Sequence, residues 1–207
     1  MIGRRLLLLT AAGAAVVAAC SPSDGGPVAS VADDGSDWHG TGLESGSNPL
    51  PDVTLTDQDG NPYNLAEDPS TAAVVLFFGY TNCPDVCPGI LADMATAKRR
   101  LPEDLVDDVT LIVVTTDPAR DTPEALKEYL ARVDDSFIGL TGSLEDIKPA
   151  ALSLGIDIAE GKQLPSGGYE VDHGSYVLGF GEDRLLRVVW NEVPVSGMKD
   201  DYARLIG

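Results

Sequence analysis

The stretch over residues 77–88, FFGYTNCPDVCP, constrains the fold most, because it places two cysteines between a strand pattern and a helix pattern. The run Ala72–Phe78 before it is apolar throughout and predicts a fully buried strand. The segment Pro88–Leu101 after it has apolar residues at helical spacing and predicts an amphipathic helix that begins at its proline, with Cys87 as the cap. Cys83 then lies in an irregular turn over the start of that helix.

A cysteine pair at this position has two chemical uses. The N-terminus of a helix carries unpaired N–H groups and the positive end of the dipole, which favours the thiolate form of a cysteine placed there. Residues four apart in a regular helix hold their Cβ atoms about 5–6 Å apart, whereas a disulfide needs about 3.8 Å. An irregular turn can close that disulfide, and a slightly wider one can admit a metal ion. Cys83 and Cys87 therefore suit reversible oxidation or a soft metal ion; a structural disulfide and two buried thiols are the alternatives.

The N-terminus has the features of an export signal. Met1–Arg5 is basic, and residues 6–19 are apolar but fall short of the roughly 20 residues that a membrane span needs. Val17–Cys20 resembles a bacterial lipobox, which implies that residues 1–19 are a lipoprotein signal peptide and that Cys20 is lipidated. An ordinary cleaved signal with an incidental cysteine is the alternative. We therefore expect an extracytoplasmic protein, held by its lipid at the outer face of the bacterial cytoplasmic membrane.

The next segment is predicted to be a tether. Residues 20–48 are rich in Ser, Gly and Asp and have hardly any large apolar residue, which predicts a lipidated N-terminus followed by a flexible linker in which His39 is solvated. The folded domain is expected over residues 49–207, the size of one ordinary domain.

Charge and cysteine usage exclude some functions. Removal of residues 1–19 takes away two of the 14 basic residues and none of the 33 acidic ones, which leaves a net charge of −21. Such acidity argues against binding to nucleic acid, which needs Lys and Arg to neutralise phosphates. It suits solubility after export, or steering toward a basic partner. With Cys20 assigned to lipid, Cys83 and Cys87 are the remaining thiols in an oxidising compartment.

The order of elements predicts an α/β fold of the thioredoxin-like type: three layers, with a central mixed sheet flanked by helices and an N-terminal β-hairpin. Residues 161–168 are rich in Gly and Pro and are predicted to be a loop. The remaining expected elements are a hairpin around Asp59-Gly60, strands over 72–78, 109–115, 137–140, 175–180 and 185–190, and helices that start at Pro88, at Pro123 with Thr122 as cap, at the cap Ser143 and at Ser196.

The same order brings distant residues together. The strands over 72–78 and 109–115 each precede a helix and should run parallel, and ligands gather at the carboxyl ends of such strands. The two cysteines follow the first strand and Asp117 follows the second. If the strand over 175–180 runs antiparallel to them, its beginning lies at the same edge, and His173 then lies near the cysteines. A histidine of a surface loop is the alternative for His173.

Two thiolates and one imidazole fit copper best. Thiolates select copper(I), zinc or iron–sulfur clusters, but structural zinc normally has four protein ligands, and the predicted domain has no fourth cysteine or histidine. Copper(I) accepts three ligands, and a water or carboxylate can complete a copper(II) state. Asp117 and Asp121 are candidates for orienting the ligands or balancing charge, and equally for caps or turns. Met94 falls on the apolar face of its helix and is assigned to the core rather than to the metal.

Three motifs in order carry a family resemblance. They are Cys83–Pro88, preceded by Phe78–Thr81, then Asp117–Pro123, then Val171–His173. With these motifs the chain resembles the Sco/SenC family, which implies a thioredoxin-like copper-binding protein that helps to assemble the dinuclear copper A centre of cytochrome c oxidase, with oxidase subunit II as partner. The resemblance implies that the ligands of that family correspond to Cys83, Cys87 and His173.

The sequence leaves more than one function open. The first is a non-enzymatic metallochaperone that carries copper. The second is a thiol–disulfide oxidoreductase that reduces the cysteines of the oxidase copper site, in which Cys83 attacks and Cys87 resolves the mixed disulfide. A peroxiredoxin-like peroxidase is weaker, because it usually has a threonine three residues before the reactive cysteine, where this chain has Tyr80. His173 separates the first two, since only copper binding needs its imidazole.

Overall fold

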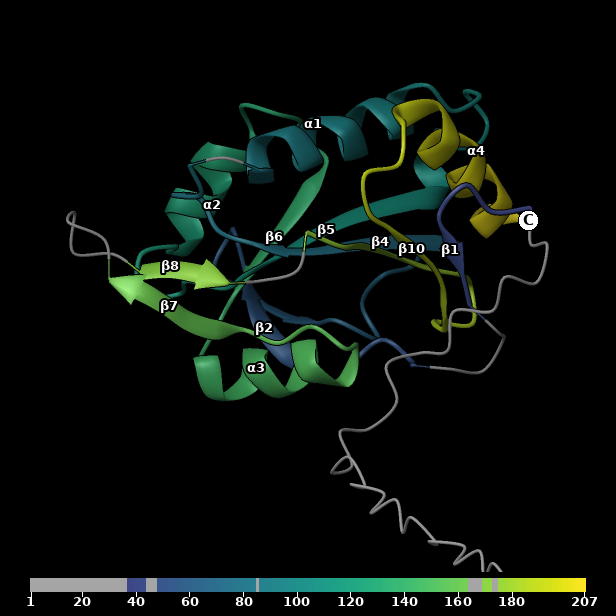
Figure 1. Ribbon diagram of the computed structural model, residues 1–207. Helices are drawn as coiled ribbons and strands as arrows, with labels where there is room; N and C mark the ends of the chain where they lie inside the picture. Colours follow the sequence, from purple (N-terminus) through teal and green to yellow (C-terminus); the bar gives the residue numbers. More distant parts are fainter. Residues whose placement is uncertain (1–36, 44–47, 85, 164–168, 173–174) are drawn as a thin grey trace, which may run out of the picture.

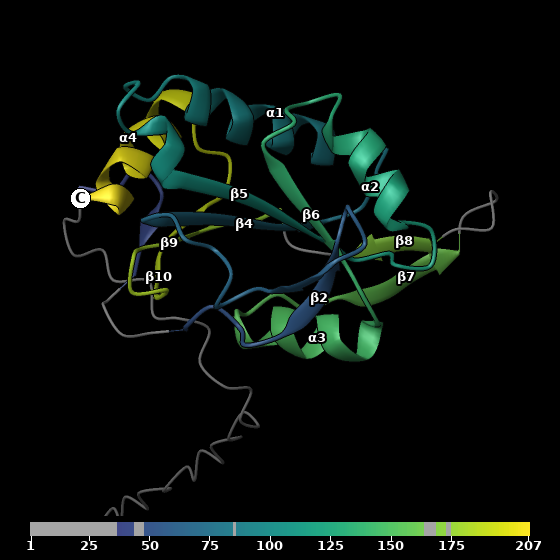
Figure 2. The ribbon, with the colours of Figure 1, turned by 180° about the vertical axis from the view of Figure 1, so that it is seen from behind.

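A mixed β-sheet with helices on both faces organises the part of the chain that the structure describes (Figure 1). The structure is a computed structural model, and the residues it describes are 37–43, 48–84, 86–163, 169–172 and 175–207. Helices α1 and α4 lie on one side of the sheet and α3 lies on the other, as both views show (Figures 1 and 2). This arrangement confirms the predicted three-layer α/β fold.

Three parallel strands form the middle of the sheet. β4, β5 and β6 run parallel, whereas β9 pairs antiparallel with β4, and β2 pairs antiparallel with β6. The predicted N-terminal hairpin joins β2 to β3, and its Gly60 has a φ of 83°, a value that favours glycine. From edge to edge the described strands are β1 (Thr41–Gly42), β10 (Leu186–Trp190), β9 (Val177–Phe180), β4 (Ala73–Gly79), β5 (Val109–Thr115), β6 (Phe137–Thr141), β2 (Thr54–Asp57) and β3 (Pro62–Asn64).

Strand β4 is buried along its whole length because helices cover both of its faces. Alternate side chains of a strand point to opposite faces. Ala73, Val75 and Phe77 join the core under α1 (Val86–Arg99) and α4 (Val195–Ile206). The intervening residues of β4 join a second core under α3 (Leu144–Ser153). Met94 belongs to the first core and is fully buried, as its place on the apolar face of α1 predicted.

The helices begin close to their predicted caps, with one difference. Thr122 Oγ1 accepts a hydrogen bond from the amide of Ala125 (3.3 Å) at the start of α2 (Pro123–Leu130). Ser143 Oγ likewise accepts one from the amide of Asp146 (3.2 Å) at the start of α3. Helix α1, however, begins at Val86, so the prediction of Cys87 as its cap is wrong. Its proline is tolerated in the first turn because an amide there has no partner within the helix. A 3₁₀ turn at 106–108 precedes β5.

A separate ribbon and an edge strand were not predicted from the sequence. β7 (Ala159–Gln163) and β8 (Tyr169–Asp172) pair as a separate antiparallel ribbon, so the predicted loop is wrong for residues 161–163. β1, within the predicted linker, pairs with β10 at the edge of the main sheet. Both are short and lack an apolar run, because a two-stranded ribbon or an edge strand is defined mainly by its hydrogen-bonded partner.

A buried carboxylate adds to the pairing of β1 in fastening the described part of the predicted linker to the domain. Asp201 of α4 is 1% exposed and accepts hydrogen bonds from the amides of His39 and Gly40 (2.9 Å each) and from Trp190 Nε1 (2.7 Å). The side chain of His39 is half exposed and lies 3.6 Å from Asp200. Residues 37–43 therefore lie on the domain. Residues 1–19 and Cys20 lie outside the described residues, and none of the described helices has the length and hydropathy to cross a bilayer.

Candidate metal centre

The two cysteines lie in one turn between β4 and α1. Cys83 is half-buried, and its amide donates a hydrogen bond to the carbonyl of Tyr80 (3.3 Å). Cys87 is 1% exposed and lies in the first turn of α1. The amide of Cys87 donates to Cys83 Sγ (3.4 Å), and the two cysteines are not joined in a disulfide. The sulfur of Cys83 therefore takes up one of the amides that the helix leaves without an internal acceptor.

The two thiols have different environments. Burial raises the pKa of the Cys87 thiol far above its usual value, and a hydrogen bond with the side chain of Cys83 raises it further. The backbone N–H of Tyr80 acts in the opposite direction. Reagents and acceptors from solution therefore reach Cys83 first, while Cys87 is protected by the core around it.

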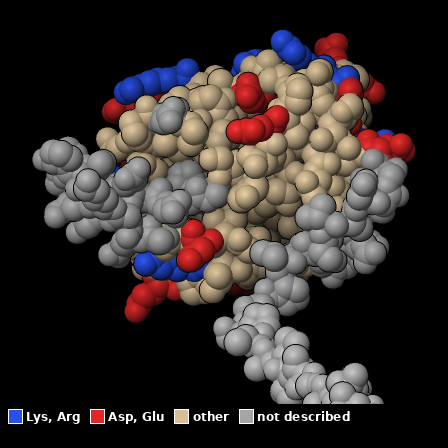
Figure 3. Space-filling view, in the orientation of Figure 1, with Lys and Arg blue, Asp and Glu red and all other residues tan. Residues whose placement is uncertain are grey.

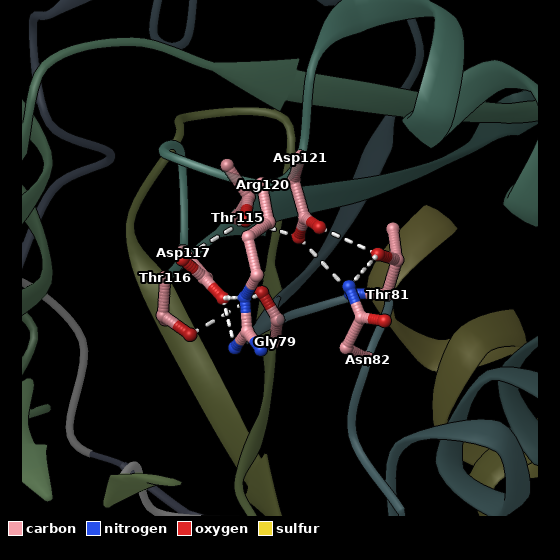
Figure 4. Close-up of polar contacts among 8 residues, drawn as sticks. All are labelled: Gly79, Thr81, Asn82, Thr115, Thr116, Asp117, Arg120 and Asp121. Atoms are coloured by element: carbon pink, nitrogen blue, oxygen red, sulfur yellow. Dashed lines mark hydrogen bonds and ion pairs between the residues drawn. The ribbon is translucent and has the colours of Figure 1, made fainter. Parts of the chain in front are cut away.

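A buried carboxylate holds the cysteine turn against the neighbouring strand (Figure 4). Asp121 is fully buried and accepts three hydrogen bonds: from the amide of Thr81 (3.0 Å), from Thr81 Oγ1 (2.5 Å) and from Thr115 Oγ1 (2.6 Å). Thr81 is two residues before Cys83, and Thr115 is the last residue of β5. Asp121 thus fixes the chain that leads into the cysteines.

Asp117 closes the turn after β5. Asp117 is 7% exposed, and its carboxylate forms an ion pair with Arg120. Its amide donates a hydrogen bond to Thr115 Oγ1 (3.0 Å). The amide of Thr116 donates to the carbonyl of Gly79 (2.8 Å), which ties the ends of β4 and β5 together. Both candidate aspartates therefore lie at the carboxyl ends of these strands, where each braces a loop (Figure 4).

His173 lies outside the described residues, so its position stays a prediction. The structure does confirm the strand direction on which that prediction depends. β9 is antiparallel to β4, and Val177 pairs with Phe77 near the end of β4. Among the described residues, no three Cys, His, Asp or Glu side chains are grouped closely enough to hold a metal ion.

Sequence reasoning missed the residues that brace this site. Thr81, Thr115 and Arg120 received no role in the sequence analysis. The available signal was position: hydroxyl and charged side chains cluster just after two parallel strands, where their ends meet.

The family model described as SCO1/SenC matches residues 45–204. The chain belongs to the SCO1/SenC family. A relative from Stutzerimonas stutzeri ("Putative copper-binding protein") is 36% identical over 138 residues, which cover 67% of this chain and 67% of the relative. "Protein SCO1 homolog 1, mitochondrial" from Arabidopsis thaliana is 34% identical over 55% of this chain, but the match spans only 36% of that longer protein.

Solved structures of Sco proteins share the fold. Bradyrhizobium japonicum ScoI, solved with copper bound, is 28% identical with a TM-score of 0.67, over 77% of this chain and 98% of that one. BsSco, described as a member of the Sco family of cytochrome c oxidase assembly proteins with a disulfide switch, is 25% identical with a TM-score of 0.62, over 79% and 96% of the two chains. Bound copper and a disulfide switch are thus both described among the relatives of this chain.

Proposed function

We propose that this Sco protein is a copper metallochaperone that serves assembly of the dinuclear copper A centre of cytochrome c oxidase. Copper is its cargo, held by Cys83, Cys87 and His173. The observation that carries the proposal is the cysteine turn, in which the amide of Cys87 lies 3.4 Å from Cys83 Sγ and no disulfide joins the pair. The copper-bound relatives support the choice of metal.

The donor set suits copper more than other ions. Thiolate sulfur and imidazole are both good ligands for copper, and structural zinc would need a fourth protein ligand. Cys83 and Cys87 are four residues apart: Cys87 lies in the first turn of α1, and Cys83 lies in the segment that leads into it. β9 runs antiparallel to β4, so β9 begins beside the end of β4. This supports a position for His173 at the edge of the sheet where the cysteines lie.

The unequal burial of the cysteines supports transfer by ligand exchange. Cys83 is the accessible ligand, so a ligand of the acceptor replaces it first, while buried Cys87 retains the metal until a second acceptor ligand is in place. Val86, next to Cys87, is 42% exposed and borders a groove of about 360 Å³ that also contains Ile90 and Val177. Where Figure 3 describes this face, most of it is uncharged, with acidic groups near its upper centre and basic groups at its periphery. We assign oxidase subunit II as the acceptor.

A copper titration tests the metallochaperone. The chain has two histidines, which gives a matched pair of variants, His173→Ala and His39→Ala. We expect one copper per chain for the wild type and for His39→Ala. His173→Ala loses more than about 100-fold in affinity, because even partners that only orient a ligand are worth about 10–100-fold. Equal affinity in all three proteins contradicts the proposed ligand set.

A thiol–disulfide oxidoreductase is the second candidate, favoured by the accessible Cys83 beside the protected Cys87. In this function Cys83 attacks a disulfide of the oxidase copper site, one acceptor sulfur leaves as a thiolate, and Cys87 then releases the second by forming the Cys83–Cys87 disulfide. Cys87→Ser should trap a mixed disulfide with subunit II, and Cys83→Ser should trap none. Absence of the adduct in the first variant rules this function out.

The location of the domain is part of the proposal. Residues 1–19 act as a lipoprotein signal, Cys20 carries the lipid, and the domain over 49–207 works outside the cytoplasmic membrane. Labelling with a fatty acid analogue tests this: the wild type should incorporate it and Cys20→Ser should not. Label retained in Cys20→Ser contradicts the assigned anchor.

A further inference from the structure

A tyrosine on α2 has a hydroxyl group for which the fold supplies no evident partner. Helix α2 lies beside the N-terminal end of α1, as both views show (Figures 1 and 2). Tyr129, near the end of α2, packs against the core that contains Cys87, with Cys83 at the border of the same core. Its hydroxyl is buried and makes no hydrogen bond among the described residues. Buried hydroxyls are nearly always hydrogen-bonded, so this one needs an explanation.

The charges that influence the hydroxyl are those of the thiol site. Burial raises the pKa of Tyr129 to about 12, and negative charge on Cys87, on Cys83 and on Asp121 contributes in that order. Cys87 is therefore the cysteine with the stronger influence on this phenol. Asp121 already accepts three hydrogen bonds from threonines, which leaves the sulfurs as the acceptors with a use for a further donor.

A copper-loaded site requires such a donor. Two thiolates and one copper(I) carry a net negative charge, which is costly in a buried environment unless donors point at it. Cys83 is half exposed and receives the amide of Cys87. The sulfur of Cys87 is shielded from solvent, so its donors must come from the protein, and the backbone N–H of Tyr80 is one of them.

We propose that Tyr129 is a positioning residue of the copper site, whose hydroxyl donates a hydrogen bond to the sulfur of Cys87 when that sulfur binds copper. The proposal rests on the copper function proposed above. It assigns the hydroxyl an acceptor, the copper-bound thiolate of Cys87, whose charged form exists only in the loaded state. The bond steadies the buried ligand and withdraws electron density from its sulfur.

The chain contains a matched control. The hydroxyl of Tyr202 is also buried without a hydrogen-bond partner among the described residues. Tyr202 lies on α4, in edge-on contact with the ring of Trp190 (centroids 5.3 Å apart), and the charge that influences its pKa is on Asp93 rather than on a cysteine. Tyr202→Phe and Tyr129→Phe therefore each remove one buried hydroxyl, from a fully buried ring in Tyr202 and a partly buried ring in Tyr129, and only the hydroxyl of Tyr129 is influenced by charge on the cysteines.

The experiment compares the full-length wild type, Tyr129→Phe and Tyr202→Phe. Each is loaded with copper, and two quantities are measured: the rate of copper loss to a chelator and the energy of the sulfur-to-copper(II) charge-transfer band. We expect Tyr129→Phe to lose copper about tenfold faster, the order of effect of one hydrogen bond to a charged group. Its band should move to lower energy, because a sulfur without that bond is a better electron donor. Tyr202→Phe should match the wild type in both.

Each other outcome overturns the proposal. If the two variants have the same rate of copper loss and the same band energy, Tyr129 has no role in the copper site, and the proposed copper function is unaffected. A wild type that binds no copper removes the copper function and this inference with it. The melting temperature of the apo proteins completes the test, since loss of an unpartnered hydroxyl should not lower it. A lower melting temperature, or failure to fold, in Tyr129→Phe alone would show that the hydroxyl already has a structural partner.

Discussion

Asp121→Asn tests whether the buried carboxylate positions the cysteine turn as well as stabilising the fold. The chain contains a second buried aspartate with three donors, Asp201, so Asp201→Asn is the natural control. Both residues are at most 1% exposed. One joins the approach to Cys83 to β5, and the other joins residues 39–40 to α4 and β10 and accepts no bond from the cysteine turn.

The expected loss of stability follows from the bonds. A hydrogen bond to a charged group contributes about 1.5–3 kcal/mol and a neutral one about 0.5–1.5 kcal/mol. Asparagine keeps the shape, but it removes the charge and replaces one acceptor oxygen by an NH2 group. The bonds to the remaining oxygen therefore weaken and the bond to the replaced oxygen is lost, a loss of about 3 kcal/mol in total. For a domain of this size, 1 kcal/mol lowers the melting temperature by about 2–4 °C. Each variant should therefore melt about 6–12 °C below the wild type in calorimetry.

Copper binding separates the two variants. Asp121→Asn loosens the turn that carries Cys83, and changes in such supporting residues typically cost about 10–100-fold in metal affinity. Asp201→Asn should keep the affinity of the wild type, measured by competition with a chelator below both melting temperatures. Equal copper affinity in the two variants refutes the positioning role of Asp121. An unchanged melting temperature in Asp121→Asn refutes the assigned hydrogen bonds.

Three further predictions concern accessibility and packing. An alkylating reagent should label Cys83 in the native apo protein well before Cys87, which is buried and has a raised pKa; mass spectrometry of peptides would show the order, and equal labelling contradicts it. Gly79→Ala should cost about 1–3 kcal/mol, because a Cβ there would lie 2.4 Å from Phe77 Cε1, whereas Gly89→Ala in open space on α1 should gain about 1 kcal/mol; denaturant unfolding that ranks them otherwise refutes this packing. Ser143→Ala removes the cap of α3 and should cost about 1 kcal/mol of unfolding free energy, and no loss would mean that the cap contributes nothing.

Elements with a strong apolar pattern could be predicted from the sequence. The buried strands β4 and β5 match their apolar runs, because a strand covered on both faces has no polar alternation. Helix caps could also be predicted: Thr122 and Ser143 each accept a hydrogen bond from a backbone amide in the first turn of the helix that follows. These features depend on residues near one another in the sequence.

Features that depend on distant partners could not be predicted. β1 is two residues long and exists because β10 offers it an edge. The first turn of α1 extends two residues before its proline, against the usual preference of a residue that precedes proline. The bonds of Asp121 join two loops that are 40 residues apart. None of these has a local pattern, because each is created by the packing of the finished sheet.

The candidate site divides in the same way. The cysteine pair and its helix were evident from spacing, whereas the antiparallel direction of β9 was a condition of the reasoning that the structure then met. What the pattern did not supply was the set of side chains that brace the turn, Thr81, Thr115 and Arg120, and the buried hydroxyl of Tyr129. Their identity depends on which loops meet above the sheet.

Copper K-edge X-ray absorption of the copper(I)-loaded protein tests the central claim most directly, because it counts the atoms bound to the metal. The account predicts two sulfur ligands and one nitrogen in the wild type, and loss of the nitrogen with retention of both sulfurs in His173→Ala. The same spectrum from both proteins would contradict it.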